Sequence, residues 1–178
     1  MHGEAIREWE QVSIGARDEL DAWVERGRIS LVQGRWAEAA AFFAPGVRAG
    51  LVTDLNLEDY GLCLVNTGKF TEGIRWMCEA RRIFPRASAM SRVGIAFFGR
   101  GRDYYNRGLY AQAARDAEQA VNLWGDAKPR ILLAASLVKL GGDWRALKYA
   151  REGLALAPEN RDAQDTLKAA EALAIRGH

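Results

Sequence analysis

The sequence has few of the residues that metal sites and acid–base catalysis usually need. Its two histidines, His2 and His178, lie at the two ends of the sequence. We therefore expect neither a catalytic imidazole nor a histidine-based metal site. The two cysteines, Cys63 and Cys78, form no Cys-x-x-Cys pair and are too few for a disulfide framework or a four-thiolate zinc site. We expect both to be reduced and packed on helices, and we expect no cofactor and no metal.

Long apolar runs and a charge excess of one sign are also missing. No run approaches the ~20 apolar residues of a membrane-spanning helix, and the N-terminal residues lack the apolar segment of a signal peptide. This pattern predicts a cytoplasmic protein with no direct membrane insertion, unless a leader or an anchor has been removed. The 25 Lys and Arg nearly balance the 23 Asp and Glu. This balance excludes a polycation and makes nucleic acid an unexpected partner.

What the sequence does contain is an internal repeat. Residues 33–39, 67–73 and 107–113 each hold a glycine, an aromatic residue two positions later, then Glu or Gln and a small residue. A looser fourth copy covers residues 141–147. The steps from Gly34 to Gly68, Gly108 and Gly142 are 34, 40 and 34 residues. A period of this size is typical of helical-repeat proteins.

Each copy predicts the end of one helix and the start of another. Glycine closes the first helix because it readily adopts the left-handed conformation, and the aromatic residue begins the second. The pattern predicts helices at 18–33, 36–50, 54–67, 71–84, 88–106, 110–123, 128–140 and 144–156, with a kink or a shorter helix at Pro45. Small residues mark the places where second-helix backbones must approach a neighbour: Ala39, Gly73, Ala113 and Ala146, and seven residues later Gly46, Ala80, Ala120 and Gly153.

These patterns resemble the tetratricopeptide-repeat family. The resemblance covers residues 20–158 and is strongest at 57–85. It implies an all-α fold: a right-handed helical-repeat solenoid of about four helix pairs with terminal capping helices. The chain, 1–178, would be a single domain of this kind. It would comprise an N-terminal helical extension (1–17), repeats at 20–51, 54–85, 88–125 and 127–158, and a C-terminal capping helix (159–178) with Asn160 as its N-cap.

Motifs that would indicate catalysis are incomplete. The segment Gly68-Lys69-Phe70-Thr71 lacks the other glycine of a phosphate-binding loop, because Cys63 stands in its place, and no strand precedes it. A serine or cysteine nucleophile would lack the histidine that usually activates it. We therefore expect no catalytic residue and no enzymatic activity.

The resemblance also implies where a partner would bind. In this family the first helix of each pair lines a concave groove that usually holds a peptide. Projected onto this sequence, the groove-facing residues are mostly apolar or aromatic: Val24, Arg28, Leu31, Glu58, Leu62, Val65, Asn66, Phe98, Arg102, Tyr105, Ile131, Ala135 and Val138. Such a lining favours a peptide or helix segment that inserts apolar side chains. The alternative for each residue is that it only packs against neighbouring helices.

A second candidate surface is basic. Between Arg81 and Arg107 seven arginines accompany one acidic residue, Asp103. Such a patch would attract an acidic segment of a partner, whereas the alternative is a solvated arginine-rich surface. Besides Arg102, already assigned to the groove, the patch comprises Arg81, Arg82, Arg86, Arg92, Arg100 and Arg107.

Together these features predict a non-catalytic protein–protein interaction module. It would act as an adaptor or chaperone-like scaffold that binds a peptide segment of another protein, acidic or apolar, in an apolar groove with an arginine-rich edge. Two alternatives remain open. The chain could self-assemble into a structural scaffold, as a homo-oligomer, or it could be an accessory or regulatory domain of a larger assembly or secretion apparatus.

Overall fold

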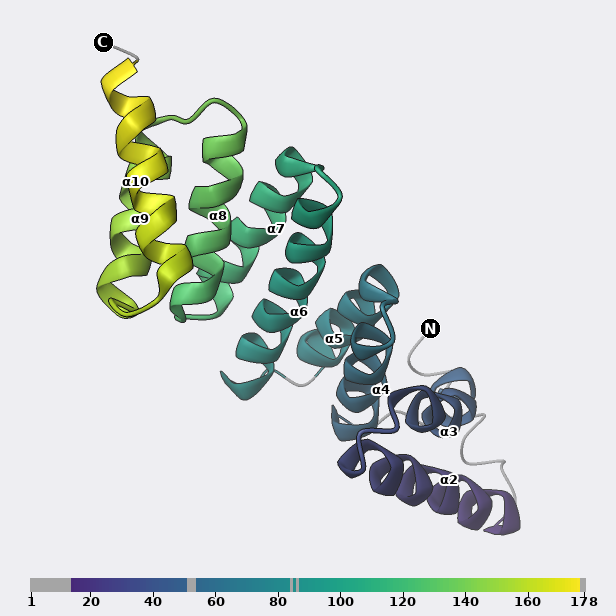
Figure 1. Ribbon diagram of the computed structural model, residues 1–178. Coiled ribbons are helices and arrows are strands. Elements are labelled where there is room, and N and C mark those ends of the chain that lie inside the picture. Colours follow the sequence, from purple (N-terminus) through teal and green to yellow (C-terminus); the bar gives the residue numbers. More distant parts are fainter. Residues whose placement is uncertain (1–13, 51–53, 84, 86, 177–178) are drawn as a thin grey trace. The chain divides into compact units, whose positions relative to one another are not determined.

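The computed structural model describes residues 14–50, 54–83, 85 and 87–176, and in this part of the chain all regular structure is α-helical. The predicted N-terminal extension lies outside the described residues up to residue 13, and residues 14–17 already belong to the first helix shown (Figure 1). The helices are α2 (Ile14–Val32), α3 (Trp36–Arg48), α4 (Asp54–Asn66), α5 (Phe70–Ile83), α6 (Ala87–Asn106), α7 (Tyr110–Leu123), α8 (Ala127–Lys139), α9 (Trp144–Leu156) and α10 (Arg161–Arg176).

The predicted all-α fold is confirmed, and the helix ends agree closely with the sequence pattern. The largest shift is at α2, which begins at Ile14 instead of residue 18. Helix α3 ends at Arg48, two residues early, with Pro45 inside its last turn. A proline removes one helical hydrogen bond, and α3 continues through Pro45 to Arg48, so the helix is not broken there. The predicted N-cap of α10 is present, because the side-chain oxygen of Asn160 accepts from Ala163 N–H at 3.0 Å.

Glycine ends the first helix of each pair, as predicted. At Gly68 the backbone has φ +82°. This left-handed residue allows Lys69 N–H to donate back to the Leu64 carbonyl at 2.9 Å. The same conformation, with φ between 69° and 74°, occurs at Gly34, Gly108 and Gly142.

The chain divides into two compact units, with the division between Ala89 and Met90. In the first unit α2 packs on α3, α3 on α4, and α4 on α5. Its buried side chains form two clusters, one around Phe43 and Cys63 and one around Leu57 and Ala80. The assignment of the whole chain to one domain stays a prediction.

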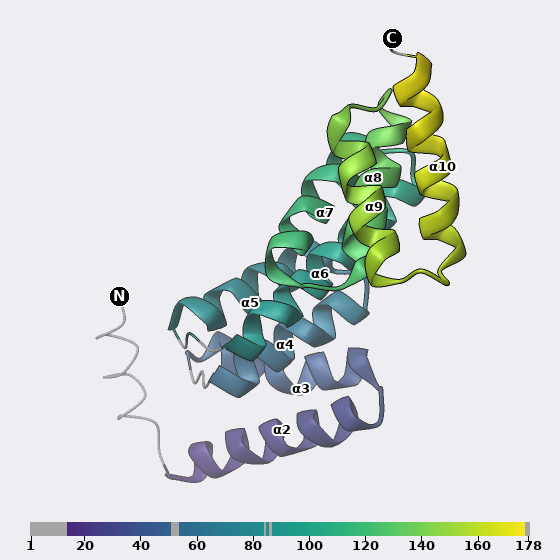
Figure 2. The same cartoon turned by 90° about the vertical axis from the view of Figure 1, so that its left-hand side faces the viewer.

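In the second unit α7 packs on α8, and α8 on α9, while α10 lies against both α8 and α9 (Figure 2). Helix α6 joins this unit through Gly94, which lies against Leu123 and Trp124, and through Gly101, which lies against Asp116 and Leu132. Alanines and leucines of α7, α8, α9 and α10 form the shared core. None of the helices in the described part of the chain is both long and apolar enough to cross a membrane.

A candidate peptide groove in the second unit

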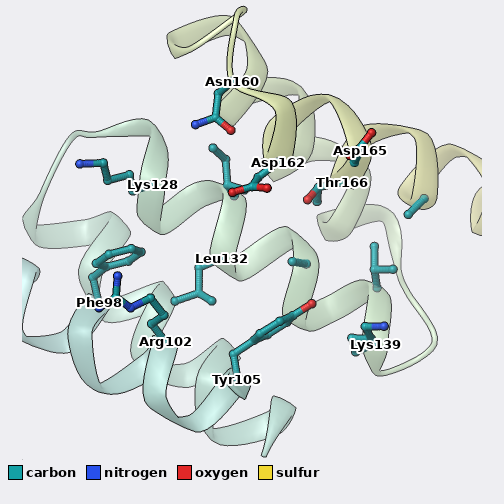
Figure 3. A pocket seen from close by; sticks show the side chains of 14 residues that line it. Phe98, Arg102, Tyr105, Lys128, Leu132, Lys139, Asn160, Asp162, Asp165 and Thr166 are labelled. Atoms are coloured by element: carbon teal, nitrogen blue, oxygen red, sulfur yellow. The ribbon is translucent and has the colours of Figure 1, made fainter. Parts of the chain in front are cut away.

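The second unit contains a groove of about 500 Å³ that could hold a partner. It lies between three helices, with α6 on one side, α8 as the floor and α10 on the other side (Figure 3). Its lining comprises Phe98, Arg102 and Tyr105 from α6, Lys128, Ile131, Leu132, Ala135, Val138 and Lys139 from α8, and Asn160, Asp162, Asp165, Thr166 and Ala169 from α10 or its N-cap.

Helical spacing explains why these side chains face one space. On α6, Phe98, Arg102 and Tyr105 are separated by four and three residues, so they lie on one stripe of the helix. Lining residues recur at the same spacing on α8, from Lys128 to Lys139, and on α10, from Asp162 to Ala169. In Figure 3 the α6 side chains lie on one side of Leu132 and the α10 side chains on the other.

The apolar part of the groove is held in place by aromatic pairs. The ring of Phe98 meets that of Trp124 edge to face, with ring centroids 5.7 Å apart. The ring of Tyr105 meets that of Tyr110 in the same way, at 5.3 Å. Each groove aromatic is therefore supported by a second ring from outside the lining, which restricts its rotamers before any partner arrives.

The charged part of the groove is divided by sign. The cationic side chains, Arg102, Lys128 and Lys139, come from α6 and α8, whereas the two carboxylates, Asp162 and Asp165, come from α10. Asp165 lies 3.8 Å from Lys168, one turn further along the same helix. The ammonium of Lys128 lies 6.0 Å from the centre of the Trp124 ring. A partner in this groove would meet positive charge on the α6 flank and on the α8 floor, and negative charge on the α10 flank.

The structure brings together every predicted groove residue of the second unit. Phe98, Arg102, Tyr105, Ile131 and Val138 line the one groove, together with Ala135. Ile131 and Leu132 also pack into the core, so they present only part of their surface to the groove. Peptide binding by these residues stays a prediction.

The predicted groove residues of the first unit have other surroundings. Val24 and Leu31 pack against the cluster of Ala39, Phe43 and Cys63. Val65 packs closely against Gly73 of α5. These three contacts correspond to the packing alternative that the sequence left open.

The polar members of that set make local contacts. Arg28 forms an ion pair with Glu25 at 2.7 Å, and the Asn66 side chain donates to the Leu62 carbonyl at 2.9 Å. Leu62 and Glu58 are half-buried. A binding role for these residues stays a prediction.

The arginines of the predicted basic patch do not form one equivalent set. Arg81 and Arg82 lie on α5 of the first unit, Arg92, Arg100 and Arg107 lie on α6, and Arg86 lies outside the described residues. Arg82 pairs with Glu79 at 2.7 Å, and Arg107 pairs with Asp103 at 3.3 Å. These contacts offset part of the positive charge that the sequence concentrates in this stretch. Use of the patch by a partner stays a prediction.

Arg100 has a packing role within the second unit. Its guanidinium donates twice to the Asp116 carboxylate, at 2.7 Å and 2.9 Å. It also lies over the rings of Phe97 and Tyr104. Both side chains of the pair are largely buried, with 19% and 9% exposed. This arginine joins α6 to α7 and is not a free surface charge.

The sequence interpretation missed the third wall of the groove. The sequence pattern predicts α10 only as a capping helix and assigns none of its side chains to binding. The signal was present in the spacing of Asp162, Asp165 and Ala169, which places polar and small residues along one stripe. Helix α10 follows α9 in the position that the first helix of a further pair would take. Its lining side chains therefore face the same space as those of α6 and α8, which are first helices.

The described residues contain no group of three or more His, Cys, Asp or Glu side chains that could hold a metal ion. Of the two cysteines, Cys63 is buried and Cys78 is exposed. Burial, together with the nearby Asp59 charge, raises the pKa of the Cys63 thiol to about 12. Cys63 is therefore a protonated packing residue at neutral pH.

No protein-family model and no curated protein sequence matches this chain. Among solved structures, it is similar to YrrB, described as a TPR protein with an unusual peptide-binding site, with a TM-score of 0.61 at 16% identity over 84% of this chain and 74% of that one.

Structures of MamA are also similar. A mutant of MamA has a TM-score of 0.61 at 15% identity, covering 89% of this chain and 90% of that one. MamA MSR-1 C2 has a TM-score of 0.57 at 17% identity, covering 90% and 99%. At these identities the likeness concerns the arrangement of helices. With the 34-residue period and the glycine-closed helix pairs, it shows that this chain has the tetratricopeptide-repeat fold.

Proposed function

We propose that this protein is a non-catalytic interaction module that binds a peptide segment of another protein in the groove between α6, α8 and α10. The observation that carries the proposal is the supported aromatic lining, in which Phe98 and Tyr105 each rest on a second ring. Side chains that are ordered before binding lose little entropy when a partner arrives, so the partner bears most of the ordering cost. The groove volume of about 500 Å³ lies within the range of pockets that hold ligands.

The composition of the groove also favours a peptide. Apolar side chains of α8, including Leu132, Ala135 and Val138, form the floor, and exposed charged side chains stand at the edges. An apolar centre with a polar rim is the usual anatomy of a protein-binding surface. The sequence predicts an arginine-rich edge to the groove, and in this proposal Arg102 is the arginine at that edge. The similar protein YrrB is itself described as having a peptide-binding site.

A displayed random-peptide library tests this proposal. The immobilised full chain should enrich peptides that bind it in solution with a measurable dissociation constant. The Ala135→Arg variant, which places a long side chain in the groove, should weaken binding of those peptides at least tenfold. Ala111→Arg is the matched control, because Ala111 is exposed on α7 and outside the groove. It should leave the affinity unchanged.

Two outcomes would remove the proposal. One is a library from which no peptide is enriched over the bare support. The other is a set of peptides that bind wild type and Ala135→Arg equally well, since their site would then lie elsewhere. Circular dichroism of both arginine variants establishes that a loss of binding does not come from a loss of fold.

A further inference from the structure

The charges around the groove are arranged so that a partner of one sign cannot satisfy them all. The positive side chains are Arg102 on the α6 flank and Lys128 and Lys139 on the α8 floor, and the carboxylates Asp162 and Asp165 are on the α10 flank. Figure 3 shows Arg102 and Asp162 on opposite sides of the floor residue Leu132. A uniformly acidic peptide would bring like charges together along α10, and a uniformly basic one would do so along α6.

Several of these charges are not used inside the protein. Among the described residues, Arg102, Lys139 and Asp162 make no ion pair within 4.0 Å, and the two flanks of the groove do not pair with each other. This differs from the nearby Arg100, whose charge is satisfied by Asp116. Charges that face a groove without an internal partner remain available to select a ligand.

The helix dipole could also explain why Asp162 is an acidic residue, but it does not explain the other polar residues of the α10 flank. Asp162 lies in the first turn of α10, where a carboxylate is favoured by the helix dipole. That effect falls off beyond the first turn, yet Asp165 and Thr166 continue the polar edge along the groove. The helix dipole therefore accounts for Asp162 but not for Asp165, which lies beyond the first turn.

Resting on the proposed function, we propose that the bound segment is amphipathic with split charge. It carries an apolar side chain against the α8 floor, an acidic side chain on the flank facing Arg102, and a basic side chain on the flank facing Asp162 and Asp165. Specificity arises as much from repulsion of the wrong sign on each flank as from attraction of the right one.

The experiment uses the peptides that the library yields on the wild-type chain. Their sequences should place an acidic and a basic residue on either side of an apolar one. In a synthetic copy, replacing the basic residue by Gln should weaken binding to wild type at least fivefold. The same replacement should have little effect on Asp162→Lys, since that variant no longer offers the facing carboxylate. A second selection on Asp162→Lys should return peptides without the basic residue.

Control variants separate charge from structure. Glu171→Lys makes the same change at an exposed position of α10 outside the groove, and it should leave the selected sequences unchanged. Asp162→Asn removes the charge while keeping a residue that is compatible with a helix start, and it should weaken the same peptides. Thermal unfolding of each variant verifies that α10 remains folded.

The outcomes distinguish the two proposals. Enriched peptides that are uniformly acidic, uniformly basic or uncharged, yet blocked by Ala135→Arg, would overturn the split-charge inference and leave peptide binding in place. Peptides that bind Ala135→Arg as well as wild type would overturn the proposed function itself. Split-charge peptides that respond to Asp162→Lys but not to Glu171→Lys support both.

Discussion

Gly61 and Gly73 face each other where α4 crosses α5, and neither position has room for a methyl group. A Cβ atom at Gly61 would lie 2.6 Å from Met77 Cγ, and a Cβ atom at Gly73 would lie 2.6 Å from the Gly61 carbonyl oxygen. The second contact is with backbone, which cannot rotate aside. The crossing therefore depends on both residues remaining glycine.

We expect Gly73→Ala to lower the free energy of unfolding by about 1–3 kcal/mol, as for other substitutions that overpack a close contact. The measurement is urea denaturation followed by circular dichroism. Gly125→Ala is the matched control, because nothing lies within 4 Å of the added Cβ and the backbone there is not left-handed. Equal midpoints for the two variants would contradict the close crossing.

The two cysteines should differ in reactivity. Burial raises the pKa of Cys63 to about 12, so its thiol stays protonated and unreactive at pH 8, whereas Cys78 is exposed. Ellman's reagent should therefore label one thiol in the folded chain and two in denaturant. With Cys78→Ser the folded chain should release almost no chromophore, and rapid labelling of this variant would show that Cys63 is accessible.

The same pKa shift gives a pH dependence of stability. Because the folded-state pKa of Cys63 is raised above its ordinary value of 9.0, the unfolded chain loses this proton first as the pH rises. The contribution of Cys63 is therefore complete below about pH 9 and is lost progressively between about pH 9 and about pH 12. Cys63→Ala should remove this component of the alkaline destabilisation.

At the scale of the elements, α6 and α7 are joined by the largely buried pair of Arg100 and Asp116. Removing one partner leaves the other charge buried and uncompensated. We expect Asp116→Ala to lower the free energy of unfolding by about 3–5 kcal/mol, measured by chemical denaturation. The double substitution Arg100→Met with Asp116→Leu should recover most of this loss, since an apolar pair needs no compensation.

An exposed ion pair on the same helix serves as the control. Asp103 and Arg107 are 43% and 62% exposed and one turn apart. Arg107→Ala should change the free energy of unfolding by less than about 1 kcal/mol. If Asp116→Ala were as mild as Arg107→Ala, the pair would not join the two helices.

The helices themselves could be predicted from the sequence, because their signals are local. A glycine at the end of one helix and an aromatic residue at the start of the next mark each pair, and Gly34, Gly68, Gly108 and Gly142 all adopt the expected conformation. The contacts between helices were harder to predict. Arg100 and Asp116 are sixteen residues apart, and Arg100 stands among exposed arginines although it shares a helical stripe with Phe97 and Tyr104. It was therefore assigned to a surface patch.

At the scale of the whole molecule, the groove was predicted in part. The residues on its α6 and α8 sides follow from the repeat period, because equivalent positions on the first helix of each pair face the same side. The α10 wall did not follow, because the resemblance to the repeat family covers only residues 20–158 and stops before this helix. Its packing against both α8 and α9 shows that α10 takes the place of the first helix of an additional pair.

Removing α10 should destabilise the second unit. Ala163 packs against Ala127 and Ile131, and Leu167 and Ala170 belong to the core shared with α8 and α9. Truncation after Asn160 would expose these surfaces, and burial of one Leu side chain alone is worth about 1.5–3 kcal/mol. We expect a lower midpoint in thermal unfolding and new binding of a hydrophobic dye. Leu167→Ala should produce a smaller effect of the same sign, and an unchanged midpoint after truncation would contradict a capping role.

The exposed end of the last helix pair bears on self-assembly. Trp144 is 72% exposed and Leu140 52% exposed, whereas the corresponding aromatic residues of the other pairs, Trp36, Phe70 and Tyr110, are half-buried. As an adaptor, the chain should keep a constant mass on dilution in static light scattering, for wild type and Trp144→Ala alike. A mass that falls on dilution for wild type but not for Trp144→Ala would favour the self-assembling scaffold.

Helix α10 is at once the lid of the second unit and one wall of the groove. Anything that binds the groove favours the states in which α10 is docked, so occupancy and the fraying of this last helix are thermodynamically linked. The amide protons of residues 161–176 would thus exchange more slowly with solvent when a ligand is bound. Ligand occupancy of this protein can therefore be followed near the C-terminal end of its chain, away from the aromatic rings of α6.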